Sequence, residues 1–314
     1  DVHYRGQVVR CGGHYYQGIA RQRLLEILQE RCREVGVEMR FEEEVTDIDQ
    51  AAAGYDLVIA ADGVNSLVRR AWEDRFKPSY RQGALKYMWL GSPWVTGSFN
   101  FVFKETEYGM FQAHTYPYTG DASTFVVMCH ESTWRRAGLD QMDAEASIRF
   151  CEEVFAEELA GRPLWTNRSQ WYSFVTVKNE KWHSGRVVLL GDAAHTAHFT
   201  IGSGTKLAME DAIALARAFE RHDDIEAALT DYELERRPVV ERFQQAARES
   251  EIYFENIDRY TRMDPLQFGF QLLTRSTRIY YANLRLRDPY FIDRVDRWYA
   301  AAAAGGAAEV LVAG

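Results

Sequence analysis

The sequence predicts an α/β fold in which a parallel sheet is interrupted by an antiparallel sheet and followed by C-terminal helices. Two short apolar runs are typical of buried parallel strands. The run 55–63 ends in an Asp-Gly turn, and the run 186–190 is followed by a Gly-Asp turn; a helix is expected after each. Between them, from about 75 to 180, aromatic and β-branched residues dominate, and this favours antiparallel strands. From 265 to 299 the pattern is helical, with many aromatic residues and arginines.

The elements of the N-terminal part follow from spacing. Leucines and a cysteine recur at helical intervals over 19–35, and Gly36 suits the end of that helix. Residues 37–41 are expected to form a strand, and 55–63 contain the next strand. Ser66 is placed to cap the helix that follows.

The middle part is expected to be a separate layer. Phe99, Phe101 and Phe103 alternate with other residue types, the pattern of a half-buried strand. One helix is expected near 141–160. The chain then returns to a parallel strand at 186–190, a helix that reaches about 220, and a long charged helix from about 225.

Composition excludes several classes of protein. Lys and Arg number 37 against 46 Asp and Glu, which gives a net charge of −9, and no basic run indicates nucleic-acid binding. No signal peptide and no run long enough for a membrane span is found. The four cysteines are far apart without a C-x-x-C pair, so neither a disulfide framework nor a zinc site is expected. The sequence predicts a cytoplasmic protein without nucleic-acid, membrane or metal partners.

The first chemical motif is DLVIAADGVNSLVRR, residues 56–70. Asp62 follows a buried strand, and its carboxylate could accept hydrogen bonds from backbone amides or from a ribose. Gly63 permits a tight turn. Arg69, one helical turn beyond Ser66, can reach a phosphate or a carboxylate. An ordinary strand–turn–helix without a ligand is the alternative.

The second motif is GDAAHTAHFTIGSGTKLAMEDA, residues 191–212. Its Gly-Ser-Gly precedes a helix N-terminus, where free amides and a partial positive charge suit an anionic or electron-rich group. The G-x-x-x-x-G-K-[ST] spacing of nucleotide triphosphatases is absent. His195 and His198 lack a third ligand at a zinc spacing. We therefore expect His195 to be a structural hydrogen-bonding residue and His198 to line a pocket.

Together the two motifs resemble the para-hydroxybenzoate hydroxylase-like family of FAD-dependent aromatic monooxygenases. Arg21 opens the helix ARQRLLEIL, DLVIAADGVNSLVR matches the family's D-G segment, and RVVLLGDAAH matches its G-D segment. The resemblance covers about 10–250. FNFVFKETEYGMFQAHTYPY and HFTIGSGTKLAMEDAIALA further resemble the hydroxylase half of the salicylyl-CoA 5-hydroxylases and 2-aminobenzoyl-CoA monooxygenases.

The resemblance implies an FAD-dependent monooxygenase that hydroxylates an aromatic acyl-CoA such as salicylyl-CoA. NADH or NADPH would reduce the flavin, and O2 would form a flavin C4a-hydroperoxide. Two alternatives are a flavin hydroxylase of a free phenolic or polyketide substrate and a non-catalytic truncated remnant. Since such hydroxylases are often fused to a second enzyme, a C-terminal reductase domain is a further expectation.

The resemblance also implies the residues of an FAD site: an arginine near the pyrophosphate, an Asp-Gly pair near the pyrophosphate and ribose, an aspartate on the ribityl chain, and amides facing the isoalloxazine. These residues are Arg21, Asp62, Gly63, Asp192, Gly202, Ser203, Gly204 and Thr205.

Catalytic and substrate residues are expected on the strands and loops of a pocket. A base that shares the substrate's phenolic proton would make the ring a better nucleophile. His114 and His198 are the leading candidates, because an imidazole titrates near neutral pH, and Tyr87 and Tyr116 are candidate substrate-binding residues. The phosphates of CoA would need basic partners, and the sequence does not choose among the available ones, Arg135, Arg136, Lys178 and Lys181.

The sequence departs from the family in two places. His198, Phe199 and Lys206 stand where most relatives have two prolines and an asparagine. The first strand and its G-x-G-x-x-G loop do not occur after Asp1, so the ADP half of the FAD site is missing from the residues given. We therefore expect this chain by itself to bind FAD weakly or not at all.

The expected domains are an N-terminally truncated, Rossmann-like FAD-binding domain at 1–74, a β-rich substrate domain at 75–180, the second part of the FAD-binding domain at 181–260, C-terminal helices at 261–300, and an Ala/Gly linker or tail at 301–314.

Overall fold

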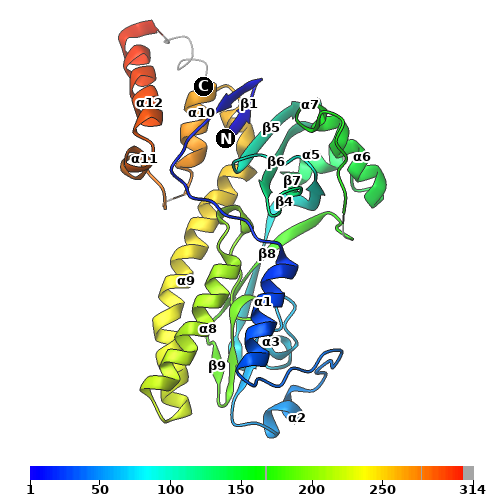
Figure 1. Cartoon of the computed structure of the whole chain (residues 1–314), viewed down its shortest axis with the longest axis vertical. Coiled ribbons are helices and arrows are strands. Elements are labelled where there is room, and N and C mark those ends of the chain that lie inside the picture. Colours follow the sequence, from blue (N-terminus) through cyan, green and yellow to red (C-terminus); the bar gives the residue numbers. More distant parts are fainter. Residues whose placement is uncertain (167, 277, 307–314) are drawn as a thin grey trace. The chain divides into compact units, whose positions relative to one another are not determined.

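The computed structural model describes residues 1–166, 168–276 and 278–306 (Figure 1). The chain divides into two compact units, each of which is described by itself. Unit 1 comprises Asp1–Met39, Ala84–Ser173 and Ile252–Gly314, and unit 2 comprises Arg40–Gly83 and Phe174–Glu251. The α/β class with parallel and antiparallel sheets and C-terminal helices is confirmed.

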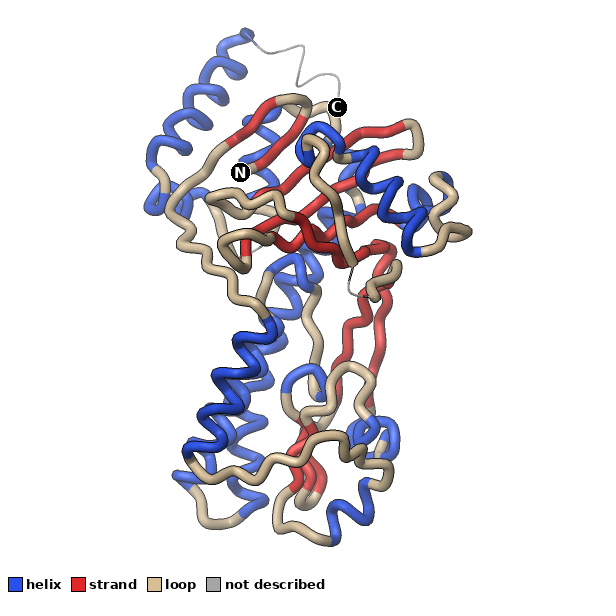
Figure 2. The backbone as a smooth tube through the Cα atoms, turned by 45° about the vertical axis from the view of Figure 1, so that its right-hand side comes forward, coloured by secondary structure: helices blue, strands red, loops and turns tan. Residues whose placement is uncertain are grey.

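Unit 1 is built on most of a seven-stranded sheet (Figure 2). The strand order is β2-β1-β5-β6-β7-β4-β8, and the pairs β5–β6, β6–β7 and β7–β4 are antiparallel, as the aromatic alternation predicts. The last two strands in this order continue along the chain into unit 2. The strands are β1 (Val2–Tyr4), β2 (Gln7–Val9), β4 (Pro78–Ser92), β5 (Asn100–Thr106), β6 (Gly109–Pro117), β7 (Ser123–His130) and β8 (Tyr172–Asn179).

The hairpin β1–β2 at the sheet edge was not anticipated from the sequence. Arg5 and Gly6, with φ of 48° and 70°, form its two-residue turn, the left-handed pair that suits the twist of a tight hairpin. β1 then pairs in parallel with β5, where Val2 lies opposite Phe101. Strands of three residues are too short to show an alternating pattern in the sequence, so they can be recognised only from the strands with which they pair.

Helices cover both faces of this sheet in unit 1 (Figure 1). Alternate residues such as Phe111, Ala113 and Val127 share an apolar core with the segment 137–164, and the intervening ones, such as Phe103 and Met110, share a core with the C-terminal helices. The period of two along a strand separates the two cores. The helices are α5 (Glu131–Arg136), α6 (Ala144–Val154), α7 (Ala156–Leu159), α10 (Pro265–Leu273), α11 (Tyr281–Arg287) and α12 (Pro289–Ala301), with single turns η3 (Ile257–Tyr260) and η4 (Ala302–Gly306).

The N-terminal helix is confirmed, but the strand expected after it is not formed. α1 spans Arg21–Glu34. Residues 37–41 have no strand pairing with any residue that the structure describes, and the side chain of Phe41 is 61% exposed. Their apolar alternation alone does not create a strand, because a ladder needs a neighbouring backbone to accept and donate hydrogen bonds. The Ala/Gly linker or tail expected at 301–314 lies, from residue 307 onward, outside the described residues.

Unit 2 contains a small sheet of order β3-β10-β9. β3 (Val58–Ala60) and β10 (Val187–Leu189) are parallel, as predicted, and β9 (His183–Ser184) joins β10 antiparallel. Both parallel strands pack in one apolar core with α8 (Gly204–Arg221) and α9 (Ile225–Glu255). The other short elements are α2 (Ile48–Ala53), α3 (Leu67–Ala71), α4 (Glu73–Phe76), η1 (Gly191–Ala193) and η2 (Phe199–Ile201).

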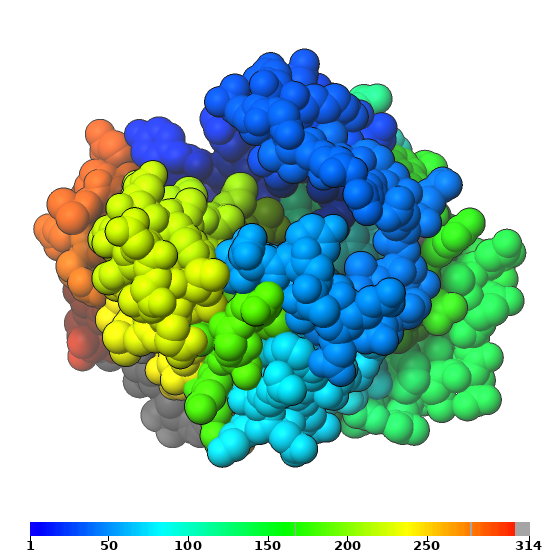
Figure 3. Space-filling model, turned by 90° about the horizontal axis from the view of Figure 1, so that it is seen from below, coloured from blue at the N-terminus to red at the C-terminus, as the bar shows by residue number. Residues whose placement is uncertain are grey.

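The helices of unit 2 are tied together at their ends. Arg221 at the end of α8 forms ion pairs with Asp231 and Glu235 on α9, and the backbone amide of Trp182 donates to Glu233. Figure 3 shows the joined ends of α8 and α9 as yellow-green and yellow atoms on one face. Within the described part of the chain, no helix is long and apolar enough to cross a membrane.

Candidate functional site

The two Asp-containing loops lie at the same edge of the small sheet in unit 2. In the parallel register Leu189 lies opposite Ala60. Asp62 follows β3 by two residues, and Asp192 follows β10 by three. Because the carboxyl ends of neighbouring parallel strands share one edge, both loops converge where α/β sheets bind their ligands.

The Asp62 loop is held by the first turn of α3. The carboxylate of Asp62 accepts from the backbone amides of Leu67 (2.7 Å) and Val68 (3.4 Å). Ser66 caps the same helix, as predicted, by accepting from the amide of Arg69 at 3.0 Å. Gly63 has φ of 79°, a conformation that favours glycine. The loop is therefore rigidly shaped by its own chain.

Arg69 joins the two loops. Its side chain is buried, and the guanidinium donates to the carbonyl oxygen of Ala193 (2.8 Å) and to that of Val64. Its Nε donates to the hydroxyl of Tyr80 at 3.3 Å. The sequence indicated a phosphate or a carboxylate as its partner, whereas the structure gives it backbone carbonyls from both motifs. A planar fork of donors can bridge two loops in this way.

A buried ionic network supports the second loop. The Nε2 of His195 donates to Asp211 at 2.7 Å, and the backbone amide of Gly191 donates to the same carboxylate at 3.3 Å. Arg236 on α9 donates to its other oxygen at 2.8 Å. His195 is thus a structural hydrogen-bonding residue, as predicted. Asp211 and Arg236 were missed from the sequence, because their partners lie 16 to 25 residues away.

The N-terminus of α8 presents backbone donors. Ser203 precedes the helix, and its hydroxyl donates backward to the carbonyl of Ile201 rather than accepting from the first turn. The first turn holds no acidic residue. Gly202 has φ of 61°, and no described atom lies within 4 Å of where its Cβ would be. The end of an 18-residue helix therefore carries a partial positive charge beside open space.

His198 is tied to its own loop. Its Nδ1 accepts from the backbone amide of Thr200 at 3.4 Å and lies 3.0 Å from the hydroxyl of that residue. The buried imidazole packs between the rings of Phe174 and Phe199. These contacts give His198 a role in shaping η2, and its role as a base stays a prediction.

In unit 1, three predicted site residues share one face of the sheet. His114 lies opposite Phe101 and Val126, and Tyr116 lies two residues further along β6. Tyr87 is on β4, on the same face by the register of β4 with β7. This is the face that meets the C-terminal helices. The register thus brings together residues that the sequence could only name separately.

Aromatic rings surround His114. Phe101 meets the imidazole edge-on at 4.7 Å between centroids, and Phe254 from the end of α9 lies at 5.1 Å. The guanidinium of Arg275 lies over Phe101 and Phe254, at 5.3 and 4.9 Å from the ring centroids. Burial lowers the pKa of Arg275 to about 10, which leaves it cationic at neutral pH. The buried imidazole of His114 is thus enclosed by aromatic rings, with a guanidinium stacked on them.

The two tyrosines on this face are poor bases. Burial raises the pKa of Tyr87 and that of Tyr116 above the ordinary value, because a phenolate is disfavoured away from water. Both phenols stay protonated at neutral pH and can donate hydrogen bonds. Among the residues predicted in unit 1, only His114 is of a type that accepts a proton near neutral pH.

The remaining basic candidates show no common site. Arg21 is exposed at the first position of α1 in unit 1. Arg135 pairs with Glu131, and Arg136 donates to the carbonyl of Tyr108. Lys178 and Lys181 are exposed in unit 2. The structure does not favour one of them as a phosphate contact.

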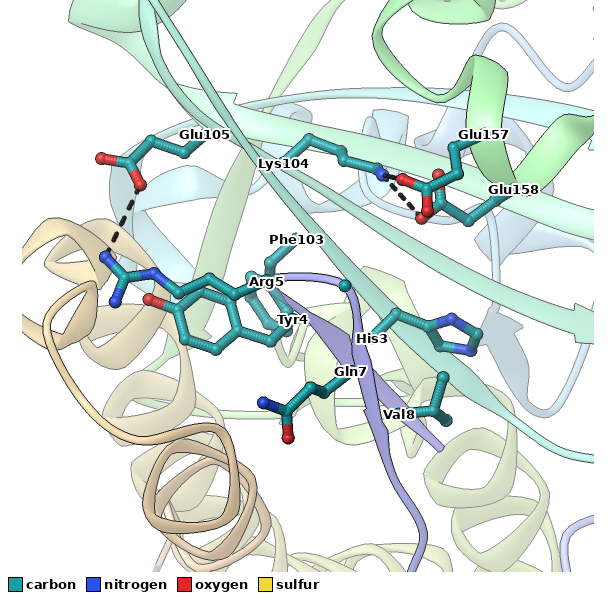
Figure 4. Close-up of a pocket in the computed structure, with 11 residues that line it drawn as sticks. His3, Tyr4, Arg5, Gln7, Val8, Phe103, Lys104, Glu105, Glu157 and Glu158 are labelled. Atoms are coloured by element: carbon teal, nitrogen blue, oxygen red, sulfur yellow. Dashed lines mark hydrogen bonds and ion pairs between the residues drawn. The ribbon is translucent and has the colours of Figure 1, made fainter.

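Two hollows lie elsewhere. One of about 270 Å³ lies in unit 1 beside the β1–β2 hairpin (Figure 4). Lys104 bonds Glu157 and Glu158 there, at 2.6 and 2.8 Å, and Arg5 faces Glu105 at 3.9 Å. Because the basic side chains of this hollow pair with its own carboxylates, they do not indicate a site for a charged ligand. The second, of about 700 Å³ in unit 2, is lined by similarly mixed charges between 73–79, 178–180 and 237–241. Among the described residues no cluster of three or more metal-ligating side chains occurs.

These features are those of a flavin-binding α/β protein: the two sheets, the two Asp-containing loops, and the N-terminus of α8, which has no side-chain cap among the described residues. The family described as an FAD binding domain matches residues 2–247, and the chain belongs to this family.

Named relatives agree with this assignment. The chain is 42% identical over 310 residues to salicyloyl-CoA 5-hydroxylase of a Streptomyces species, covering 95% of this chain and 59% of that protein. It therefore spans about three fifths of the length of that relative. It is 39% identical over 254 residues to 3-hydroxy-4-methyl-anthranilyl-[aryl-carrier protein] 5-monooxygenase of Streptosporangium sibiricum, covering 81% of this chain and 68% of that protein.

Solved structures show the same fold. The tetrameric form of 2-methyl-3-hydroxypyridine-5-carboxylic acid oxygenase matches with a TM-score of 0.63 at 21% identity, over 85% of this chain and 78% of that one. PqsL, a probable FAD-dependent monooxygenase from Pseudomonas aeruginosa, matches with a TM-score of 0.63 at 24% identity, over 82% and 79%.

The residues of unit 2 fit FAD, the cofactor of this family. A flat, electron-rich ring system can approach Gly202 closely, because no side chain stands there. The first amides of α8 are donors without a side-chain cap within the described residues, which suits a carbonyl that gains negative charge. Asp192 is exposed among buried neighbours, and a carboxylate in such a place suits the hydroxyls of a sugar alcohol.

Proposed function

We propose that this chain is the hydroxylase part of an FAD-dependent monooxygenase acting on an aromatic acyl thioester, with salicylyl-CoA as the leading substrate. The observation that carries the proposal is the 42% identity to salicyloyl-CoA 5-hydroxylase over 95% of the chain. This identity extends over the aromatic sheet face of unit 1 as well as the loops of unit 2. NADH or NADPH would be the reductant, and O2 the source of the oxygen atom.

The FAD site of this proposal uses the loops of unit 2. Asp192 would bind the ribityl hydroxyls, and the amides from Gly202 to Thr205 would face the isoalloxazine carbonyl. Asp62 and Gly63 would lie near the pyrophosphate and ribose, and Arg21 would balance the charge of the pyrophosphate. Bound FAD would supply the activation of O2 and the delivery of one oxygen atom to the ring.

The side chains of unit 1 would orient the substrate. The aromatic ring would lie on the face around His114, where Phe101 and Phe254 exclude water. His114 would accept the phenolic proton, which makes the ring more nucleophilic, and the protonated Tyr87 and Tyr116 would donate hydrogen bonds. His198 is the alternative base.

The test compares substrates in one assay. NAD(P)H oxidation by the flavin-loaded protein is measured with salicylyl-CoA and with free salicylate, and the product is identified by mass. Stimulation by the thioester with a product heavier by one oxygen atom supports the proposal. Stimulation by the free acid alone would overturn the thioester part. Because the chain by itself is expected to hold FAD weakly, the whole proposal is overturned only if a version extended by an N-terminal βαβ unit also takes up no flavin.

An aryl-carrier-protein thioester is the second candidate substrate. The observation that favours it is the 39% identity to the anthranilyl-[aryl-carrier protein] monooxygenase. The same assay with a salicyl-loaded carrier protein separates the two, because a carrier-specific enzyme would turn over the protein thioester and leave the CoA thioester unused.

A further inference from the structure

Gln112 is a buried amide in the middle of the aromatic face of unit 1. It lies on β6, two residues before His114, and its side chain is fully buried. Neither its Nε2 nor its Oε1 has a hydrogen-bond partner among the described residues. Buried side-chain amides are normally hydrogen-bonded, and an exception calls for an explanation.

The register places Gln112 on the same face as the predicted substrate residues. It lies opposite Phe103 on β5 and opposite Met128 on β7, and Met128 lies opposite Tyr87 on β4. Residues directly opposite in antiparallel strands share a face and lie in contact range. We call these four residues, Phe103, Gln112, Met128 and Tyr87, the Gln112 row.

The neighbours in the Gln112 row explain why the amide is unsatisfied. Phe103 offers no hydrogen-bonding atom, and the thioether of Met128 is only a weak acceptor. The next row, through Phe101, His114, Val126 and Trp89, supplies aromatic and aliphatic groups. Leucine or methionine would fit this apolar setting better than glutamine, because an unmet amide loses its hydrogen bonds to water on folding.

The open side of this face lies toward β4. Trp89, at the end of the neighbouring row, is 41% exposed, and Tyr87 is half-buried. On the opposite side Phe254 covers Phe101 and His114.

We propose that Gln112 is a specificity-determining residue that binds the acyl carbonyl and the ortho hydroxyl or amino group of the aromatic substrate together. This inference rests on the proposed function. A primary amide carries a donor and an acceptor side by side in one plane. An ortho-hydroxy or ortho-amino aryl thioester presents the complement, a carbonyl acceptor beside an OH or NH donor. The Nε2 donates to the carbonyl oxygen, and the Oε1 accepts from the ortho group.

The two hydrogen bonds also orient the ring. With the carbonyl and the ortho group held at Gln112, the ring can no longer rotate by half a turn on the sheet face. His114, two residues along the strand and on the same face, is then within reach of the ortho group. Gln112 thus selects the protonated substrate, and the single phenolic proton leaves its hydrogen bond to Oε1 when it passes to His114.

The experiment compares Gln112→Met with the matched control Met128→Leu. Both changes lie in the Gln112 row and keep the volume nearly constant, but only the first removes a donor and an acceptor. Dissociation constants are measured for salicylyl-CoA and for benzoyl-CoA, which lacks the ortho donor, with the wild type and both variants. Thermal unfolding of each protein is recorded beside them.

The wild type should prefer salicylyl-CoA over benzoyl-CoA by about tenfold or more, as expected for a site built to bond a hydroxyl. Gln112→Met should bring this ratio close to one, while Met128→Leu keeps it. The melting temperature of Gln112→Met should stay equal or rise, because removing an unsatisfied buried amide does not destabilise a core. If the preference for salicylyl-CoA over benzoyl-CoA disappears while the melting temperature is unchanged, misfolding cannot be the cause.

The outcomes separate this inference from the proposed function. If Gln112→Met keeps the wild-type ratio, the inference is overturned and the proposed function stands. If the wild type binds neither thioester, the proposed function is overturned, and the inference with it. If Gln112→Met unfolds, Gln112→Leu is measured in the same way, and loss of stability in both variants would show a structural role and overturn the inference.

Discussion

Replacing Arg69 by methionine tests whether the two Asp-containing loops of unit 2 depend on one buried guanidinium. The change removes the hydrogen bonds to Ala193 and Val64, one in each motif. Ala193 is fully buried, so its carbonyl oxygen would lose its charged donor without gaining water, at about 1.5–3 kcal/mol. Val64 is partly exposed, so its carbonyl would regain water, and that loss should be about 0.5–1.5 kcal/mol. We expect a total loss of about 2–4.5 kcal/mol.

The matched control is the neighbouring arginine. Arg70 is on the same helix but exposed, and among the described residues its guanidinium donates to the carbonyl of Asn65. Arg70→Met should change the free energy of unfolding by no more than about 0.5 kcal/mol. Urea unfolding followed by circular dichroism measures both, and flavin fluorescence measures FAD affinity, which should fall about tenfold or more only in Arg69→Met, equivalent to about 1.4 kcal/mol. Equal unfolding midpoints for the two variants would refute the bridging role.

Three further predictions concern unit 2. Asp211→Ala should lower the free energy of unfolding by about 3–5 kcal/mol, measured in urea, because it removes the buried carboxylate that binds both His195 and Arg236 and leaves Arg236 with Glu210 alone among the described residues. Gly202→Ala should cost about 1 kcal/mol in thermal unfolding through its positive φ and should weaken FAD binding, whereas unchanged binding would argue against a flavin at this glycine. The hydrogen bond from His183 to Glu233 raises the pKa of that histidine, so its contribution to stability is complete below the unfolded value of about 6.5 and is lost as pH rises through the folded pKa. The urea midpoint of the wild type should therefore fall between about pH 5.5 and about pH 8.5, and in His183→Gln the part of this fall that comes from His183 should be absent.

Much of the fold follows from local patterns. The helix at α1, the parallel strands β3 and β10, the antiparallel layer between them and the Ser66 cap are all confirmed. Each depends on residues within a few positions of one another, which is the range over which periodicity and capping act. The strand expected at 37–41 is absent from the described structure, because a strand also needs a partner that its own sequence does not name.

The loops of the candidate site could be predicted from the sequence, but the hydrogen bonds that hold these loops in place could not. The D-G and G-D segments are continuous in the chain, so their residues could be compared directly with the motifs of the family that they resemble. Arg69 was noticed, but its carbonyl partners 124 residues away were not. Asp211 sits in a helix whose pattern gives no sign that it would bind His195 and Arg236.

What the sequence by itself determined is which residue types stand after which strands, since strand, turn and helix signals act over short distances. It also placed the chain in its family through two motifs in the right order. Only the tertiary structure decided which side chains share a face: the register that aligns Tyr87, Met128 and Gln112 comes from three strands separated by turns and loops. The unmet amide of Gln112 became visible only there, because hydrogen-bond satisfaction of a buried group depends on every neighbour that folding brings to it.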